Sequence, residues 1–167
     1  MAYTVVLRTH EGNRPALNLQ VYSDEQTLAD FARAARLHAA WRELRVALMH
    51  EAAATGMPVI RHSWLAYPDD PACTGNHAQF FLGPDLLVAP VVKQGTDRVA
   101  AYLPSGSGTW THVFSGSSHE AGAGISVTVA APVGEPGLFV RAGGEDAAGL
   151  VERLRSAVRD SQATDAG

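Results

Sequence analysis

Cysteine and lysine are almost missing from this chain of 167 residues, since each occurs once, at Cys73 and at Lys93. A single cysteine excludes a disulfide framework within the chain and argues against a zinc site built from thiolates. We expect Cys73 to be an unreactive thiol in a loop, because nothing around it in the sequence would activate it. A single lysine argues against a phosphate-binding loop that depends on lysine, and the sequence contains no such motif.

Long apolar runs and blocks of like charge are also missing. No apolar run approaches the roughly 20 residues that a membrane helix needs, so we expect no membrane-spanning segment. The N-terminus lacks a charged region followed by an apolar stretch and a cleavage site, so we expect no signal peptide and a cytoplasmic chain. The net charge is −4, and no basic stripe is interleaved with aromatic residues. We therefore expect no nucleic-acid partner.

Motifs for metal binding, nucleophilic catalysis and cofactors are not visible. The seven histidines are scattered and form no H-E-x-x-H pattern. No G-x-S-x-G elbow occurs. We therefore predict no metal and no cofactor. Asp69 and Asp70 are an adjacent carboxylate pair, but prolines stand on both sides of them. Aspartate is favoured in turns because it hydrogen-bonds nearby backbone, so we prefer a turn to a catalytic pair here.

The first third of the chain has the pattern of one strand followed by a long helix. The apolar run over residues 2–7 favours a short buried strand. Ser23 and Gln26 have the spacing of a capping box and predict the start of a helix. Gly56 and Pro58 predict its end. A straight helix of about 30 residues is long for a globular protein, so we expect a break inside it.

After residue 58 the pattern changes to short strands separated by turn residues. Strands are expected at 59–66, 86–92, 98–103, 110–114, 125–130 and 137–141. Alternating apolar residues over 125–130 predict one buried face. Several such strands favour an antiparallel sandwich. An amphipathic helix is expected at about 146–160, followed by a polar tail that we expect to be disordered.

The stretch LRTHEGNRP, residues 7–15, is a cluster of polar, hydrogen-bonding side chains near the start of the chain: two arginines, a histidine, a glutamate and an asparagine. Two interpretations stay open from residue types alone. It is either a polar loop that caps the preceding strand, or a site in which Arg8, His10 and Glu11 stand at the carboxyl end of a barrel strand. Active sites of (β/α)8 barrels are built at that end of the strands.

Four stretches resemble the C-terminal end of family-31 glycoside hydrolases, a group with α-glucosidases, α-xylosidases and sulfoquinovosidases. They are RTHEGNRP at 8–15, TGMPVIRHSWLAYPDDP at 55–71, QFFLGPDLLVAPVVKQG at 79–95 and YLPSGSGTWTHVFSG at 102–116. The RTHEGNRP form is more similar to the sulfoquinovosidase branch. The resemblance implies an α+β chain: residues 1–57 are the last β/α unit of a (β/α)8 barrel, 58–143 an antiparallel β-sandwich, and 144–167 a terminal helix and disordered tail.

The resemblance also implies a chemistry. The family uses two aspartates in a retaining mechanism, and both come from earlier barrel strands, so no catalytic residue is assigned here. His10 matches the histidine that hydrogen-bonds hydroxyls of the sugar substrate. Arg8 is a weaker match, and Glu11 is either a partner of His10 or a solvated loop residue. We therefore expect an α-glycosidase portion that is inactive alone. The alternatives are a non-enzymatic β-sandwich interaction module, and a barrel whose missing segment is supplied by a separate chain.

Overall fold

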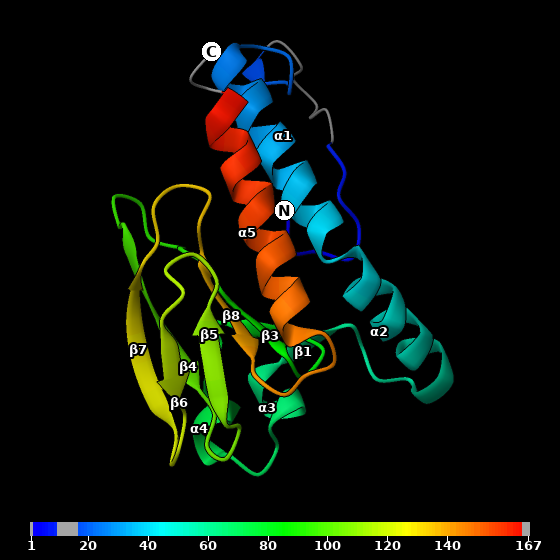
Figure 1. Cartoon of the computed structure of the whole chain (residues 1–167), viewed down its shortest axis with the longest axis vertical. Coiled ribbons are helices and arrows are strands. Elements are labelled where there is room, and N and C mark those ends of the chain that lie inside the picture. The colour runs from blue at the N-terminus through cyan, green and yellow to red at the C-terminus, as the bar shows by residue number, and fades with distance from the viewer. Residues whose placement is uncertain (1, 10–16, 165–167) are drawn as a thin grey trace.

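Eight short strands and two long helices make up most of the computed structural model, which describes residues 2–9 and 17–164. Six strands form one sheet in the order β1-β2-β3-β8-β5-β6, and β4 and β7 form a second, two-stranded sheet (Figure 1). Every strand pair is antiparallel. The strands are β1 (Ile60–His62), β2 (Phe80–Leu82), β3 (Leu86–Ala89), β4 (Arg98–Leu103), β5 (Thr109–His112), β6 (Ser118–Glu120), β7 (Ile125–Ala130) and β8 (Gly137–Arg141).

The central strands of the large sheet are buried on both faces, and their side chains alternate between two cores. From β8, Leu138 and Val140 join the core beneath the helices, whereas Phe139 joins the core beneath β4 and β7. From β3, Leu87 lies in the second core between two residues of the first. Successive side chains of a strand point to opposite faces, so one apolar run serves both cores. The molecule therefore has three layers: helices, large sheet and small sheet.

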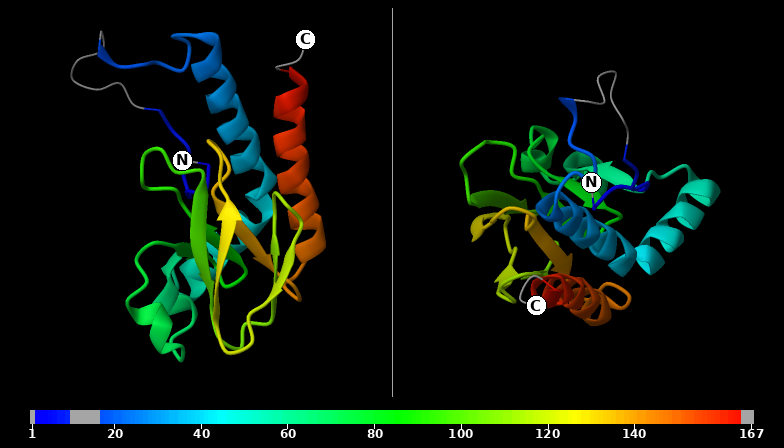
Figure 2. Two further views of the ribbon diagram at one scale, coloured as in Figure 1. Left: turned by 90° about the vertical axis from the view of Figure 1, so that its left-hand side faces the viewer. Right: turned by 90° about the horizontal axis from the view of Figure 1, so that it is seen from above.

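Two helices cover one face of the large sheet. Helix α1 (Glu25–Ala40) and helix α5 (Ala147–Thr164) lie side by side and run in opposite directions (Figure 2). Leu37 from α1 and Leu150 and Leu154 from α5 are buried together in the first core. Residues at positions i and i+4 lie on one helix face, so Leu150 and Leu154 both face the core that α5 shares with α1.

A third helix, α2 (Arg42–Thr55), projects away from the other two (Figure 1). It contacts the sheet through its one buried residue, Leu48, which lies against the turn at Gly83. A Cβ on Gly83 would stand 2.5 Å from a Leu48 methyl, and its φ of +62° also favours glycine. An ion pair between Glu51 and Arg61, 2.6 Å long, joins α2 to β1.

Two local expectations for the N-terminal part are wrong. Residues 2–7 form turns and bends rather than a strand. A strand needs a neighbour for its backbone hydrogen bonds, and no strand of the described part of the chain pairs with this segment. The helix cap lies one residue later than expected: Asp24 accepts from the Thr27 N–H at 2.6 Å, while Ser23 accepts from the Gln20 N–H. Aspartate and serine are similarly good N-caps, so residue type alone does not separate them.

Other expectations are confirmed, with some elements missed. The long helix breaks at Trp41, it ends at Gly56 in the left-handed region, and the terminal helix is α5. Four of the expected strands correspond to β4, β5, β7 and β8, and the first and second of the expected strands are shorter, as β1 and β3. Four elements were not predicted from the sequence: β2, β6 and two single-turn helices, α3 (Ser63–Ala66) and α4 (Pro71–Thr74). The expected disordered tail begins within α5, and residues 165–167 lie outside the described part.

No helix among residues 2–9 and 17–164 combines the length and the apolar character that crossing a bilayer requires.

One histidine, His112, is buried in an apolar environment, where its charged form is disfavoured. His112 on β5 is 2% exposed, and its ring lies 5.0 Å from that of Phe139. Its Nδ1 lies 2.8 Å from the Ser115 hydroxyl, while its Nε2 has no partner among the described residues. Burial lowers the pKa of His112 to about 4, helped by repulsion from His119 and Arg155. The native protein therefore keeps this ring neutral.

We predict that His112 makes the protein lose stability in mild acid. The unfolded chain binds the proton below about pH 6.5, whereas the native chain binds it only near pH 4. The stabilisation is therefore complete above about pH 6.5 and is lost as the pH falls toward 4. In His112→Asn, which keeps an acceptor near Ser115, the melting temperature should fall less between pH 7 and pH 5, by roughly a few degrees. His50→Asn, at an exposed site on α2, is the control. Equal slopes for both variants and the wild type would contradict this account.

Candidate active-site segment

The polar cluster singled out in the sequence is only partly described. His10 and Glu11 lie outside the described residues, so the structure does not test their proposed contact with each other or with a sugar. Arg8 is described, and its side chain is exposed. The structure shows in detail the start of the N-terminal segment, residues 2–9, that leads into the cluster: Ala2 and Tyr3 are 7% and 6% exposed.

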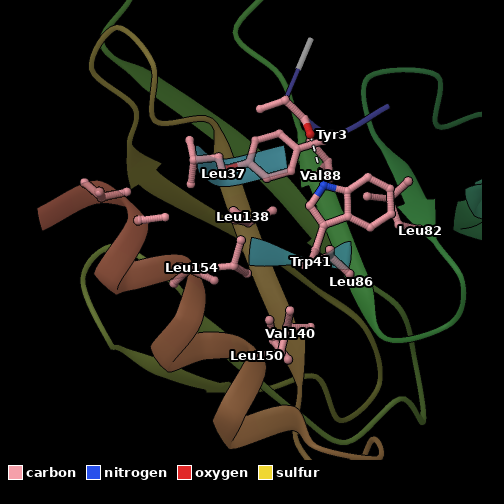
Figure 3. Close-up of a cluster of buried hydrophobic side chains, with 14 of the residues drawn as sticks. Tyr3, Leu37, Trp41, Leu82, Leu86, Val88, Leu138, Val140, Leu150 and Leu154 are labelled. Carbon is pink, nitrogen blue, oxygen red and sulfur yellow. Dashed lines mark hydrogen bonds between the residues drawn. The ribbon is translucent and has the colours of Figure 1, made fainter. Parts of the chain in front are cut away.

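The beginning of the segment is fixed to the bend between α1 and α2. The indole Nε1–H of Trp41 donates to the Ala2 carbonyl at 3.0 Å, and His38 Nδ1 lies 3.1 Å from the same oxygen. A carbonyl only accepts, so His38 carries its proton on Nδ1. Burial lowers the pKa of His38, and the hydrogen bond to Ala2 opposes that shift. Figure 3 shows Tyr3 and Trp41 packed together with Leu82 of the sheet.

An apolar groove of about 800 Å³ lies beside this anchored segment. Loops 90–96 and 131–136 form one side of it, and α1 and the N-terminal residues form the other. Val92 and Val133, on these two loops, are 84% and 89% exposed. An ion pair of 2.7 Å between Arg33 and Glu135 ties α1 to the second loop. A groove with this apolar lining favours contact with another apolar surface.

No group of three histidine, cysteine or carboxylate side chains suited to a metal occurs within residues 2–9 and 17–164. His62 and His77 come closest together, with Nε2 of His62 3.1 Å from Nδ1 of His77. The Nδ1 of His62 accepts from the Trp64 backbone N–H, which leaves the proton of the neutral ring on Nε2. The nitrogen that faces His77 therefore donates a hydrogen bond and has no lone pair for a metal.

The Asp69–Asp70 pair has the structural role expected of it. Asp70 is 5% exposed and accepts from three donors: the N–H groups of Ala72 and Ser105, at 3.0 and 2.7 Å, and the Tyr102 hydroxyl, at 2.9 Å. Burial alone would raise the pKa of Asp70, but these hydrogen bonds outweigh burial and lower it. Asp69 is exposed. Asp70 therefore caps α4 and joins it to β4, so its carboxylate has a structural role.

Cys73 lies in the short helix α4 rather than in a loop and is fully buried, and burial raises the pKa of its thiol to about 11. This agrees with the expectation of an unreactive thiol, because the thiolate is the reactive form.

Comparison with known proteins identifies the family. Residues 56–144 match the model of the glycosyl hydrolase family 31 C-terminal domain. The chain is 45% identical over 141 residues to the sulfoquinovosidase of Agrobacterium fabrum, with 84% of the chain covered. The chain belongs to glycoside hydrolase family 31. It is also 40% identical over 155 residues to the sulfoquinovosidase of Escherichia coli, with 93% of the chain covered.

Solved family-31 structures share this fold. A sulfoquinovosidase from E. rectale, in complex with an aza-sugar inhibitor, superposes with a TM-score of 0.82 at 32% identity over 93% of the chain. An α-xylosidase from a soil metagenome superposes with a TM-score of 0.71 at 26% identity over 78% of the chain. The chain spans about a fifth of the length of its relatives, 21% and 22% of the two curated sulfoquinovosidases and 22% and 19% of the two structures.

We predict that Asp70→Ala destabilises the protein while Asp69→Ala does not. Removing the Asp70 carboxylate leaves the Ser105 N–H and the Tyr102 hydroxyl without their acceptor, which should cost about 2–4 kcal/mol of unfolding free energy. Asp69→Ala, at an exposed position, should change it by less than about 0.5 kcal/mol. Urea unfolding followed by circular dichroism measures both. Equal losses in the two variants would show that the three hydrogen bonds to Asp70 do not matter.

Proposed function

We propose that this chain serves as the C-terminal portion of a retaining α-glycoside hydrolase, of the sulfoquinovosidase type rather than the α-glucosidase type. The supporting observation is the 84% and 93% coverage of the chain in its matches to two sulfoquinovosidases. A solved sulfoquinovosidase also covers more of the chain than the α-xylosidase does, 93% against 78%. Its place of action in this proposal is the cytoplasm, in carbohydrate metabolism.

In this proposal the N-terminal part of the chain binds the substrate and the rest supports it. Residues 1–57 complete a (β/α)8 barrel and bring His10, Arg8 and Glu11 to a sugar, whereas residues 58–143 form a sandwich that supports the barrel and 144–167 pack against it. An imidazole suits a sugar hydroxyl, because one nitrogen donates or accepts while the other is held by a neighbour. Arg8 can donate several hydrogen bonds from a fixed plane. Glu11 orients His10 or stays in solvent.

The bond-breaking step belongs to two carboxyl groups outside these 167 residues in this proposal. In a retaining mechanism one carboxylate attacks the anomeric carbon and a glycosyl–enzyme ester forms. The second carboxyl gives its proton to the leaving oxygen, and as a carboxylate it then takes a proton from the water that hydrolyses the ester. Without these two groups, the role of the chain is to bind and support.

We predict that the purified chain alone does not hydrolyse aryl α-glucoside or aryl α-sulfoquinovoside, because the proposal puts the nucleophile and the acid/base outside its residues. Turnover at enzyme-like rates, on the order of 1 per second or more, would refute this part of the proposal. Release of the chromogenic aryl group measures it directly.

A chimera tests the positive part of the proposal. In it the chain replaces the matched portion of E. coli sulfoquinovosidase, 22% of that protein's length. We expect the chimera to hydrolyse the aryl α-sulfoquinovoside. His10→Ala should lower kcat/KM by about 10- to 100-fold, the cost of one lost substrate hydrogen bond. His50→Ala, at an exposed position on α2, is the matched control. A folded chimera that cleaves neither substrate would sink the proposed function.

The apolar groove favours a second candidate function, a non-enzymatic interaction module. In that case the isolated chain should bind an apolar dye or self-associate through the groove. Glutamate at both Val92 and Val133 should abolish this behaviour, and Leu28→Glu, on the exposed part of α1, should not. Dye fluorescence and gel filtration measure it. A monomeric wild-type chain that binds no dye counts against this function.

A further inference from the structure

The bend between α1 and α2 lies at a single residue, Trp41, which ends one helix and begins the next. Its backbone, with φ −104° and ψ 19°, leaves the helical region, and no side chain caps the start of α2. Its indole is fully buried in the first core. A buried indole needs a hydrogen-bond acceptor for its N–H, and the acceptor here is the Ala2 carbonyl at 3.0 Å.

Two donors from one stretch of helix meet on this carbonyl. Trp41 and His38 are three residues apart and therefore on one helix face, and both reach the Ala2 oxygen, at 3.0 and 3.1 Å. Their rings lie edge to face, with centroids 5.8 Å apart. A carbonyl with two lone pairs accommodates both donors. The Ala2 carbonyl is therefore fixed in direction as well as in position.

Two arginines hold the bend itself. Arg45 lies with its guanidinium carbon 4.7 Å from the centroid of the Trp41 ring and donates to the His38 carbonyl at 2.8 Å. Arg153 of α5 donates to the Ala40 carbonyl at 3.3 Å and pairs with Asp146 at 2.7 Å. The residues that clamp Ala2 are thereby tied to α2 and to α5.

We propose that Trp41 and His38 are positioning residues for the substrate-binding segment: by clamping the Ala2 carbonyl, they set the course of residues 3–9 and the place of Arg8. Arg8 is six residues beyond Ala2, within about 20 Å even for an extended chain. The described segment has no strand pairing of its own, so its course depends on side-chain packing, of Tyr3 in the first core and of Val5 against it, and on this anchor. The role in substrate binding rests on the proposed function, whereas the clamp does not.

Hydrogen exchange, measured on the 167-residue chain alone rather than on the chimera, tests the clamp. Trp41→Phe keeps an aromatic ring in the core but removes the donor, and should speed amide exchange in residues 3–9 at least tenfold. His38→Leu should act in the same direction. His38→Asn, whose amide N–H can replace Nδ1–H, should restore slow exchange, which a loss of packing alone would not predict. Trp64→Phe, at an exposed tryptophan on α3, is the matched control. Unchanged exchange in residues 3–9 in Trp41→Phe overturns the proposal.

Kinetics of the chimera test the link to substrate. Trp41→Phe and His38→Leu should each lower kcat/KM for aryl α-sulfoquinovoside at least fivefold, mainly through KM, while His38→Asn stays within twofold of the unsubstituted chimera. If the chimera is active and its KM is unchanged in both Trp41→Phe and His38→Leu, the positioning role is overturned. A chimera that is inactive before any substitution instead rejects the proposed function, and the exchange experiment on the chain alone then decides the clamp.

Discussion

Burial of the central strands on both faces is the constraint on which the rest of the structure depends. Leu138 and Val140 of β8 face the helices, and Phe139 between them faces β4 and β7. A register shift of one residue would exchange these faces, putting Phe139 beneath the helices and Leu138 and Val140 beneath β4 and β7. The neighbouring strands β3 and β5 pair with β8 on either side, so they inherit its register. The helices and the small sheet can then cover the large sheet in only one arrangement.

The helices have a second role because α1 carries the contact to the N-terminal segment. Leu37 and Trp41 belong to the same core as Leu138, so the position of α1 on the sheet also places the donors for the Ala2 carbonyl. Helix α5 fixes α1 from the other side through Leu150 and Leu154. The large sheet therefore bears on the N-terminal segment through this shared core, which holds Tyr3 together with Leu82 and Val88. This packing is a physical way in which the β-rich part could support the N-terminal segment, as the proposed function requires.

The sequence predicted what depends on local pattern. The helix stop at Gly56, the break in the long helix and strands β4, β7 and β8 follow from turn residues and from periodicity, and the structure confirms them. It did not predict β2, because Phe80–Leu82 is a continuous apolar run of three residues with no alternation to detect. It wrongly predicted a strand at residues 2–7, because apolar character signals burial and not hydrogen-bonded pairing. Tyr3 is indeed buried, in the core between the helices and the large sheet, but no strand pairs with its backbone. Whether a buried segment becomes a strand depends on a neighbour that the local pattern does not contain.

The residues of the candidate site also differ in whether a local sequence pattern could predict their role. The cluster of Arg8, His10 and Glu11 attracted notice because its residues are adjacent, and family resemblance gave His10 a role. Trp41 and His38 were visible only as part of a helix, because their acceptor lies 39 and 36 residues away. A short motif can identify the groups that touch a substrate, but the groups that hold the motif in place are brought to it by tertiary packing. Ala2 illustrates the difficulty further, since its backbone oxygen makes the contact and the identity of its side chain therefore gives no sign of it. The side chains that make the clamp are therefore those of Trp41 and His38. The residues of the segment that they hold contain no pattern from which the clamp could be predicted.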